Sequence, residues 1–144
     1  SYLHARISPM DTSHITYLGE LRTEITHVRS GQRFVTDAPV DNKGKGEAIS
    51  PTDLLATSLG ACMITTMDIV ARDKGIVLRG VSARIVKHMA AGPRRVQRVE
   101  VFLEMDGSTL DADQRALMEK TAHGCPVAVS LHPDLVQAVH FSYV

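Results

Sequence analysis

The chain has two cysteines, and each lies where a thiol could do chemistry. Cys62 is in the middle of a long apolar stretch with helical spacing, and Cys125 directly precedes Pro126 at the predicted start of another helix. Because the two residues are far apart in the sequence, only the fold can bring their sulfurs together. If it does, the pair is a dithiol that can cycle through a disulfide, and the chain is a redox enzyme. If it does not, the two cysteines are small hydrophobic residues.

A cysteine reacts as its thiolate, so its reactivity depends on what lowers the pKa of the thiol. Cys125 is predicted to be the N-cap of the helix that begins at Pro126, where free N–H groups favour negative charge on sulfur. His123 could add a positive neighbour. Cys62 is about three turns into its helix, beyond the reach of the N-terminal dipole. We therefore expect a lowered pKa for Cys125, and we expect burial to raise the pKa of Cys62 unless a distant cation packs against it.

Less specific explanations exist for both cysteines. A free cysteine on a buried helix is often a packing residue, and Cys-Pro is a common junction at the start of a helix. His123 and Cys125 could also supply metal ligands, but a structural zinc site takes four ligands and the other candidates are scattered along the sequence. We therefore predict no metal and no cofactor.

The composition limits the classes of function. The 144 residues suit one domain, residues 1–144, with residues 1–14 as a loose N-terminal arm. With 16 basic and 16 acidic residues the formal net charge is zero, so we predict no nucleic-acid partner. The N-terminal residues lack a signal-peptide pattern, and no stretch approaches the ~18 uninterrupted apolar residues of a membrane span. We therefore expect a cytoplasmic protein without a membrane partner.

The helix that carries Cys62 is the strongest local signal. It begins at Ser50-Pro51-Thr52-Asp53, with an N-cap serine, a proline at the first helical position and an acid three residues after the cap. The apolar residues that follow keep helical spacing up to Gly75, a typical residue after a helix end. The first half of this helix is apolar on nearly every side, which favours a partner subunit that covers it.

The rest of the chain is predicted to form strands and two shorter helices. Alternating apolar residues indicate two hairpins and a last strand, and capping residues indicate the helices. The predicted strands are 18–29, 32–36, 76–89, 96–105 and 136–144, and the predicted helices are 111–122 and 125–131. Strands grouped in pairs favour an α+β fold rather than a doubly wound parallel sheet.

Together these motifs resemble the OsmC/Ohr family, the osmotically inducible and organic hydroperoxide resistance proteins. The resemblance covers about residue 18 to the C-terminus, and its strongest segments are 50–56, 59–62 and 125–131. Asp37-Ala38-Pro39 and Lys87-His88 fit a more divergent branch of the family. The resemblance implies an OsmC-like α+β fold made as an intertwined homodimer, with two long central helices flanked by sheets and with active sites at the subunit interface.

The resemblance also implies a thiol-dependent peroxidase that reduces organic hydroperoxides, with hydrogen peroxide as a further candidate substrate. Carried over by motif, Cys62 attacks the peroxide and becomes a sulfenic acid, and Cys125 resolves it as a disulfide. An external dithiol then restores the pair. Such family members use an arginine on the first hairpin, for which Arg22 is the best positional match and Arg29 and Arg33 are rivals.

One residue of that family pattern does not carry over. The peroxidases of the family have a glutamate beside the proline of the cysteine helix, whereas Thr52 follows Pro51 here, and the nearest acids are Asp53 and Glu47. Asp53 is equally explained as a capping residue. Thr52 favours an alternative function, a non-catalytic OsmC-like dimer that binds a small apolar ligand in a pocket near the cysteines. A structural domain with inert cysteines is the third hypothesis.

Overall fold

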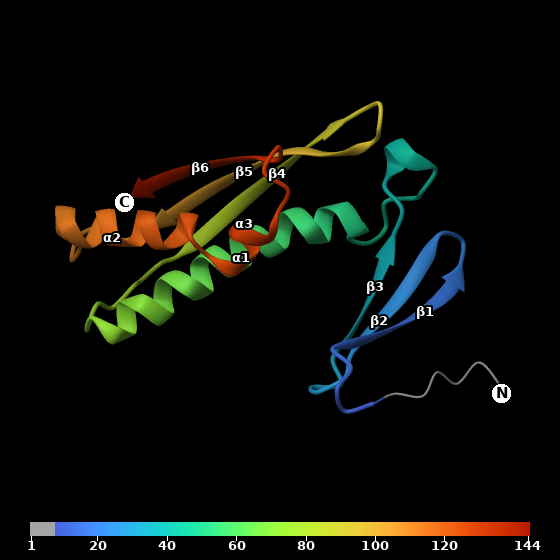
Figure 1. Ribbon diagram of the computed structural model, residues 1–144, viewed down its shortest axis with the longest axis horizontal. Helices are drawn as coiled ribbons and strands as arrows, with labels where there is room; N and C mark the ends of the chain where they lie inside the picture. The colour runs from blue at the N-terminus through green and yellow to red at the C-terminus, as the bar shows by residue number, and fades with distance from the viewer. Residues whose placement is uncertain (1–7) are drawn as a thin grey trace. The chain divides into compact units, whose positions relative to one another are not determined.

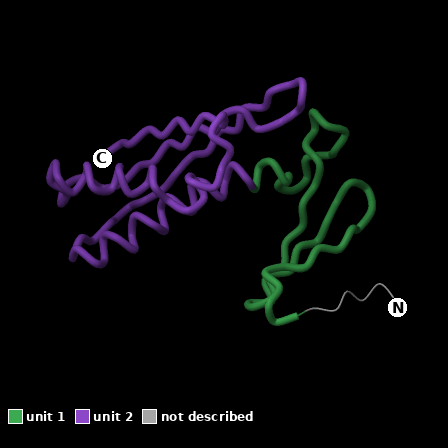
Figure 2. The backbone as a smooth tube through the Cα atoms, in the orientation of Figure 1, with its two compact units in different colours: residues 1–54 green, residues 55–144 purple. Residues whose placement is uncertain are grey.

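The computed structural model describes residues 8–144 and divides the chain into two compact units, residues 1–54 and residues 55–144 (Figure 2). Unit 1 holds a three-stranded sheet, and unit 2 holds a second three-stranded sheet with most of the helical residues. Part of the predicted N-terminal arm, residues 1–7, lies outside the described residues, and Ser13 and His14 already belong to a strand. That all of these residues form one domain stays a prediction.

Unit 1 is an antiparallel sheet in the order β1 (Ser13–Gly19), β2 (Arg22–His27) and β3 (Arg33–Asp37). The predicted single strand 18–29 is therefore wrong. A two-residue loop, Glu20-Leu21, divides it into the end of β1 and the whole of β2. Both loop residues have positive φ angles, 56° and 64°, as the hairpin turns that match strand twist require. Those turns usually contain asparagine or glycine, so the sequence carries no signal for this one.

The loop between β3 and the long helix contains a short 3-10 helix, η1 (Val40–Asn42). Helix α1 (Pro51–Asp73) begins where it was predicted to begin. The N–H of Asp53 donates to Ser50 Oγ at 3.0 Å, and the N–H of Ser50 donates to Asp53 Oδ2 at 3.0 Å, which is a reciprocal capping box. At the other end Gly75 has a φ of +68°, and the N–H of Ile76 returns to the carbonyl of Ala71.

Unit 2 has a mixed sheet in the order β4 (Ser82–Ala90), β5 (Arg95–Met105) and β6 (Val136–Tyr143). Strands β4 and β5 form the predicted antiparallel hairpin, although β4 begins six residues later than the predicted residue 76. Strand β6 is parallel to β5. The connection between these parallel strands carries α2 (Ala112–His123) and α3 (Pro126–Ser130) (Figure 1). The predicted α+β fold is confirmed.

The core of unit 2 lies between the inner face of the sheet and the helices. The four alternating residues Val99, Val101, Leu103 and Met105 of β5 are buried, as their period of two predicts. They share one cluster with buried residues of the helices. From α1 and α2 these include Ala56, Leu59, Met63, Met67, Ala71, Met118 and Ala122.

Helix α1 buries only part of its apolar surface. Leu55 is 39% exposed and Ile69 is 58% exposed. By length and composition alone α1 could cross a membrane, but that test is also passed by the core helix of a soluble protein. That a partner subunit covers this helix stays a prediction.

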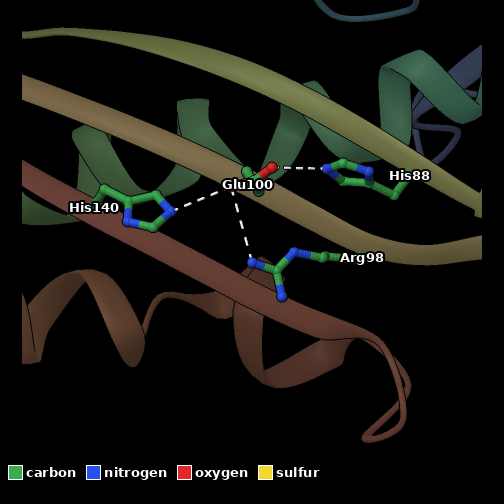
Figure 3. A network of polar contacts seen from close by, with 4 residues as sticks. All are labelled: His88, Arg98, Glu100 and His140. Atoms are coloured by element: carbon green, nitrogen blue, oxygen red, sulfur yellow. Dashed lines mark hydrogen bonds and ion pairs between the residues drawn. The ribbon is translucent and has the colours of Figure 1, made fainter.

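The outer face of the second sheet carries a polar network centred on Glu100 (Figure 3). His88 Nε2 of β4 lies 2.8 Å from Glu100 Oε1, and His140 Nε2 of β6 lies 3.3 Å from Oε2. Arg98 Nη2 lies 3.8 Å from Oε2. The hydrogen bond from His88 is the main reason why the pKa of Glu100 is lowered. Because its partners come from all three strands, the carboxylate links the sheet across its exposed face.

Candidate functional site

The fold of unit 2 brings the two cysteines together. Cys62 lies in α1, and Cys125 is the N-cap of α3. The N–H of Val127 donates to Cys62 Sγ at 3.5 Å, and the N–H of Ala128 donates to Cys125 Sγ at 3.4 Å. Since these two N–H groups belong to consecutive residues, both sulfurs lie at the first turn of α3. Both cysteines are free thiols, and the same turn of a single chain supplies a hydrogen bond to each sulfur.

The two thiols have opposite pKa shifts. Burial alone would raise the pKa of Cys62, but hydrogen bonds from Val127 N–H, the Cys125 thiol and the Thr66 hydroxyl outweigh it, so the pKa of Cys62 is lowered. Burial raises the pKa of Cys125, and the neighbouring Cys62 sulfur raises it further, against the lowering effect of the Ala128 N–H. Cys62 is therefore the thiol that ionises first, and Cys125 keeps the proton that it donates to Cys62.

This result reverses the expectation from sequence. Cys125 is the N-cap of α3 as predicted, but it is also fully buried, with 0% of its surface exposed. Loss of hydration disfavours a buried thiolate by more than one capping hydrogen bond stabilises it. Cys62 is far from its own helix N-terminus, yet it receives the N–H of Val127 from another helix. The donor that matters is distant in sequence, and local spacing could not identify it.

Thr66 is a residue of this site that the sequence reasoning missed. Its Oγ1 lies 3.8 Å from Cys62 Sγ. Residues four apart lie one above the other on a helix face, so the spacing from Cys62 to Thr66 was an available signal. Near Cys62, helix α1 packs closely against β4 because Gly60 has no side chain. A Cβ atom added to Gly60 would lie 2.5 Å from Ile85 Cδ1.

Arg22, the arginine that the family resemblance favours, begins β2 in unit 1. Its Nη1 lies 3.4 Å from Glu47 Oε2. Its cross-strand neighbour Asp37 is only 1% exposed and accepts a hydrogen bond from the N–H of Glu47 at 3.0 Å. Arg22 Nε and Asp37 Oδ1 are buried without a hydrogen-bond partner. Asp37 thus holds in place the segment that contains Glu47, and the carboxylate of Glu47 pairs with the Arg22 guanidinium.

The other candidates of unit 1 lie elsewhere. Arg33 Nη1 is 3.9 Å from Glu24 Oε1 on the sheet, and Arg29 is exposed in the turn that follows β2. Of the two acids near the cysteine helix, Asp53 caps α1 and Glu47 pairs with Arg22. Which arginine serves Cys62 stays a prediction, because all three belong to unit 1 and the thiol pair belongs to unit 2.

His123 makes an aromatic contact with the last strand of the sheet. Its ring lies edge-on to Phe141, with 6.0 Å between the ring centroids. Over residues 8–144, no three side chains of histidine, cysteine, aspartate or glutamate gather closely enough to hold a metal ion.

The family comparison gives a clear result. The model of the family described as OsmC-like protein matches residues 44–137, a span that includes both cysteines. The chain therefore belongs to the OsmC-like family, which comprises the OsmC and Ohr proteins. No curated protein matches the chain.

Solved structures agree with the family assignment. A protein from Psychrobacter arcticus 273-4, proposed to be an osmotic stress induced and detoxification response protein, is 48% identical, covers 95% of this chain and 99% of its own, and has a TM-score of 0.87. An organic hydroperoxide resistance protein, OsmC, from Legionella pneumophila is 19% identical, covers 95% and 100%, and has a TM-score of 0.70. The organic hydroperoxide resistance protein OhrB of Bacillus subtilis is 17% identical, covers 91% and 98%, and has a TM-score of 0.63.

The opposite pKa shifts predict selective labelling of the thiols. With a small excess of iodoacetamide at pH 7, we expect the native protein to be alkylated at Cys62 well before Cys125, because only thiolate reacts and Cys125 is also buried. Mass spectrometry of the two cysteine peptides measures both rates. In urea the two rates should become similar. Equal rates in the native protein would contradict the difference in pKa.

Proposed function

We propose that this chain is a cysteine-based peroxidase that reduces organic hydroperoxides through Cys62 and Cys125. The OsmC-like family includes organic hydroperoxide resistance proteins, which supports a peroxide-related redox role. The observation that carries the finer proposal is the thiol pair itself. One thiol has a lowered pKa, and its direct neighbour has a raised one and holds a proton. The lowered pKa is what an attacking cysteine needs, and a second thiol beside it can resolve the sulfenic acid once it has lost its proton.

In the first step the Cys62 thiolate attacks the outer oxygen of the hydroperoxide. An S–O bond forms, the O–O bond breaks, and the alkoxide leaves and takes up a proton to become an alcohol. Sulfur loses two electrons and becomes a sulfenic acid, while the peroxide is reduced. Negative charge develops on the departing oxygen, and a guanidinium stabilises such charge. We assign this role to Arg22.

In the second step the Cys125 sulfur loses its proton and attacks the sulfur of the sulfenic acid. An S–S bond forms, the S–O bond breaks, and the departing hydroxide takes the proton to become water. Both sulfurs lie at the first turn of α3, where consecutive N–H groups reach them, and the step joins them by a bond of about 2.0 Å. An external dithiol then reduces the disulfide by exchange and is itself oxidised to a disulfide.

The first test follows turnover and its product together. Cys62→Ser should abolish consumption of an organic hydroperoxide in the presence of a dithiol, because it removes the nucleophile. Cys125→Ser should lose multiple turnover but still allow one oxidation at Cys62, seen by mass spectrometry as one added oxygen. Wild-type protein treated with equimolar peroxide should instead contain a Cys62–Cys125 disulfide. Both thiols staying free at modest peroxide excess would refute the proposal.

The second test addresses Arg22. Arg22→Ala should lower kcat/KM for the hydroperoxide by about a hundredfold, the usual cost of removing one group that stabilises charge in the transition state. Arg33→Ala is the matched control, since it removes a guanidinium from the same sheet and should have little effect. Steady-state peroxide consumption measures both. If Arg33→Ala were the variant that lost activity, the role would belong to Arg33.

We also propose that the functional form is a homodimer in the cytoplasm. Unit 1 leaves several apolar side chains of its sheet and loops exposed, among them Ile15, Tyr17, Leu18 and Leu21. A groove of about 560 Å³ runs along α1 of unit 2, between Ile64 and Ile69 on the helix and Leu78 and Val81 beyond it. Exposed apolar surfaces of this kind mark sites of association. Two free thiols also suit a reducing compartment.

The third test addresses the dimer. Wild-type protein should elute as a dimer in size-exclusion chromatography with light scattering. Ile69→Lys places a charge on the exposed face of α1, where Ile69 is 58% exposed, and should shift the protein toward monomer. Burial of one isoleucine contributes ~1.5–3 kcal/mol, so the dissociation constant should rise at least tenfold. Val144→Lys, at a residue 69% exposed, is the control and should leave the dimer intact. A monomeric wild-type protein at high concentration would contradict the proposal.

The alternative function is a dimer that binds a small apolar ligand without turnover. The observation that favours it is Thr52, which stands where the family peroxidases have glutamate. Native mass spectrometry would show the bound ligand, and no dithiol would support peroxide consumption. The pairing of Glu47 with Arg22 weakens this alternative, because Glu47 gives the arginine a carboxylate partner in place of the glutamate that Thr52 replaces.

A further inference from the structure

The lowered pKa of Cys62 depends on hydrogen-bond donors that are all neutral and all belong to unit 2. They are the N–H of Val127, the thiol of Cys125 and the hydroxyl of Thr66. The first is a main-chain group, and the second is the resolving residue of the proposed reaction. Thr66 is the one donor that has no other role in the mechanism described above.

The orientation of Thr66 differs from that of its neighbour Thr65. Thr65 Oγ1 donates to the carbonyl of Ala61 at 2.9 Å, one turn earlier in the helix, a common arrangement for threonine in helices. Thr66 Oγ1 instead contacts the sulfur of Cys62 at 3.8 Å. The same residue type at adjacent positions therefore satisfies its hydroxyl in two ways, and only one of them reaches the thiol pair.

A hydroxyl suits both protonation states of a thiol. It accepts from an S–H group, and by rotating it donates to a thiolate. A main-chain N–H can only donate. Thr66 can therefore stay hydrogen-bonded to Cys62 while the thiol ionises. This contact keeps the Cys62 sulfur where the N–H of Val127 also reaches it.

We propose that Thr66 is a further functional residue of this site, which donates a hydrogen bond to the Cys62 thiolate and positions its sulfur for attack. The identity of Cys62 as the attacking residue rests on the proposed function. The contact itself does not, because it concerns the ionisation of a thiol and can be measured without any peroxide.

The test compares four proteins: wild type, Thr66→Val, Thr66→Ser and Thr65→Val. The rate of alkylation by iodoacetamide is followed from pH 5 to pH 10 by mass spectrometry of the Cys62 peptide. Valine keeps the shape of threonine but has no hydroxyl, so the midpoint of the profile should move to higher pH in Thr66→Val. At pH 6 the rate should fall about two- to fourfold, because losing the hydrogen bond lowers the thiolate fraction while the more basic thiolate is somewhat more nucleophilic.

The other variants separate the hydroxyl from its surroundings. Thr66→Ser keeps the donor and should retain the wild-type profile, and Thr65→Val should also retain it, because that hydroxyl bonds to a carbonyl. At high pH, where Cys62 is ionised in every variant, Thr66→Val should react at least as fast as wild type. A substitution that acted only through packing would not make alkylation slower than in wild type at pH 6 and at least as fast at high pH.

Three results would overturn the proposal. They are a wild-type profile for Thr66→Val, an equal shift for Thr65→Val, or a shift in Thr66→Ser as large as that in Thr66→Val. Circular dichroism shows whether each variant is folded. If Thr66→Val unfolds, Thr66→Ala takes its place and is compared with Thr66→Ser. A protein without peroxidase activity that still shows the shift would refute the proposed function alone. An active protein without the shift would refute the role of Thr66 alone.

Discussion

The N–H of Val127 points at the sulfur of Cys62 from 3.5 Å, and the candidate site depends on this contact between α3 and α1. It exists because α2 ends at His123, with Gly124 as its C-cap, and the chain turns directly into α3, with Pro126 at the first helical position. The first N–H groups of a helix have no partner within it. In α3 two of them have sulfur acceptors, Cys62 for Val127 and Cys125 for Ala128. The same contacts therefore cap a five-residue helix and bring a thiol pair together.

Burial turns this pair of similar residues into two different thiols. Cys125 belongs to the core of unit 2, in one cluster with Met118 and Ala122, and no water reaches its sulfur. Cys62 lies at the margin of the same cluster and is only partly buried. A buried thiol keeps its proton because the thiolate would lose its hydration. That proton is then available for a hydrogen bond to Cys62, so the high pKa of one residue helps to lower the pKa of the other.

Those parts of the fold that depend on neighbouring residues could be predicted from the sequence. The capping box at Ser50, the cap at Asp111 and the turn into α3 at Pro126 each need only a few adjacent residues, and all three are found as predicted. The hairpin at Glu20-Leu21 was missed because neither residue is a usual turn former. The pKa order of the cysteines was predicted the wrong way round because both burial and the Val127 donor come from tertiary packing.

The neutral donors around Cys62 also bear on what an arginine could contribute. Formation of the thiolate is a property of the resting protein, and hydrogen bonds within unit 2 already favour it. Charge on the departing oxygen is absent from the bound peroxide and develops as the O–O bond breaks, so an interaction with that charge raises the rate rather than the ground-state affinity. In the proposed reaction a guanidinium therefore has more to contribute at the peroxide than at the thiol. Within unit 1, Glu47 pairs with Arg22, and the buried Asp37 accepts a hydrogen bond from the segment that carries Glu47, which is why the proposal gives this role to Arg22.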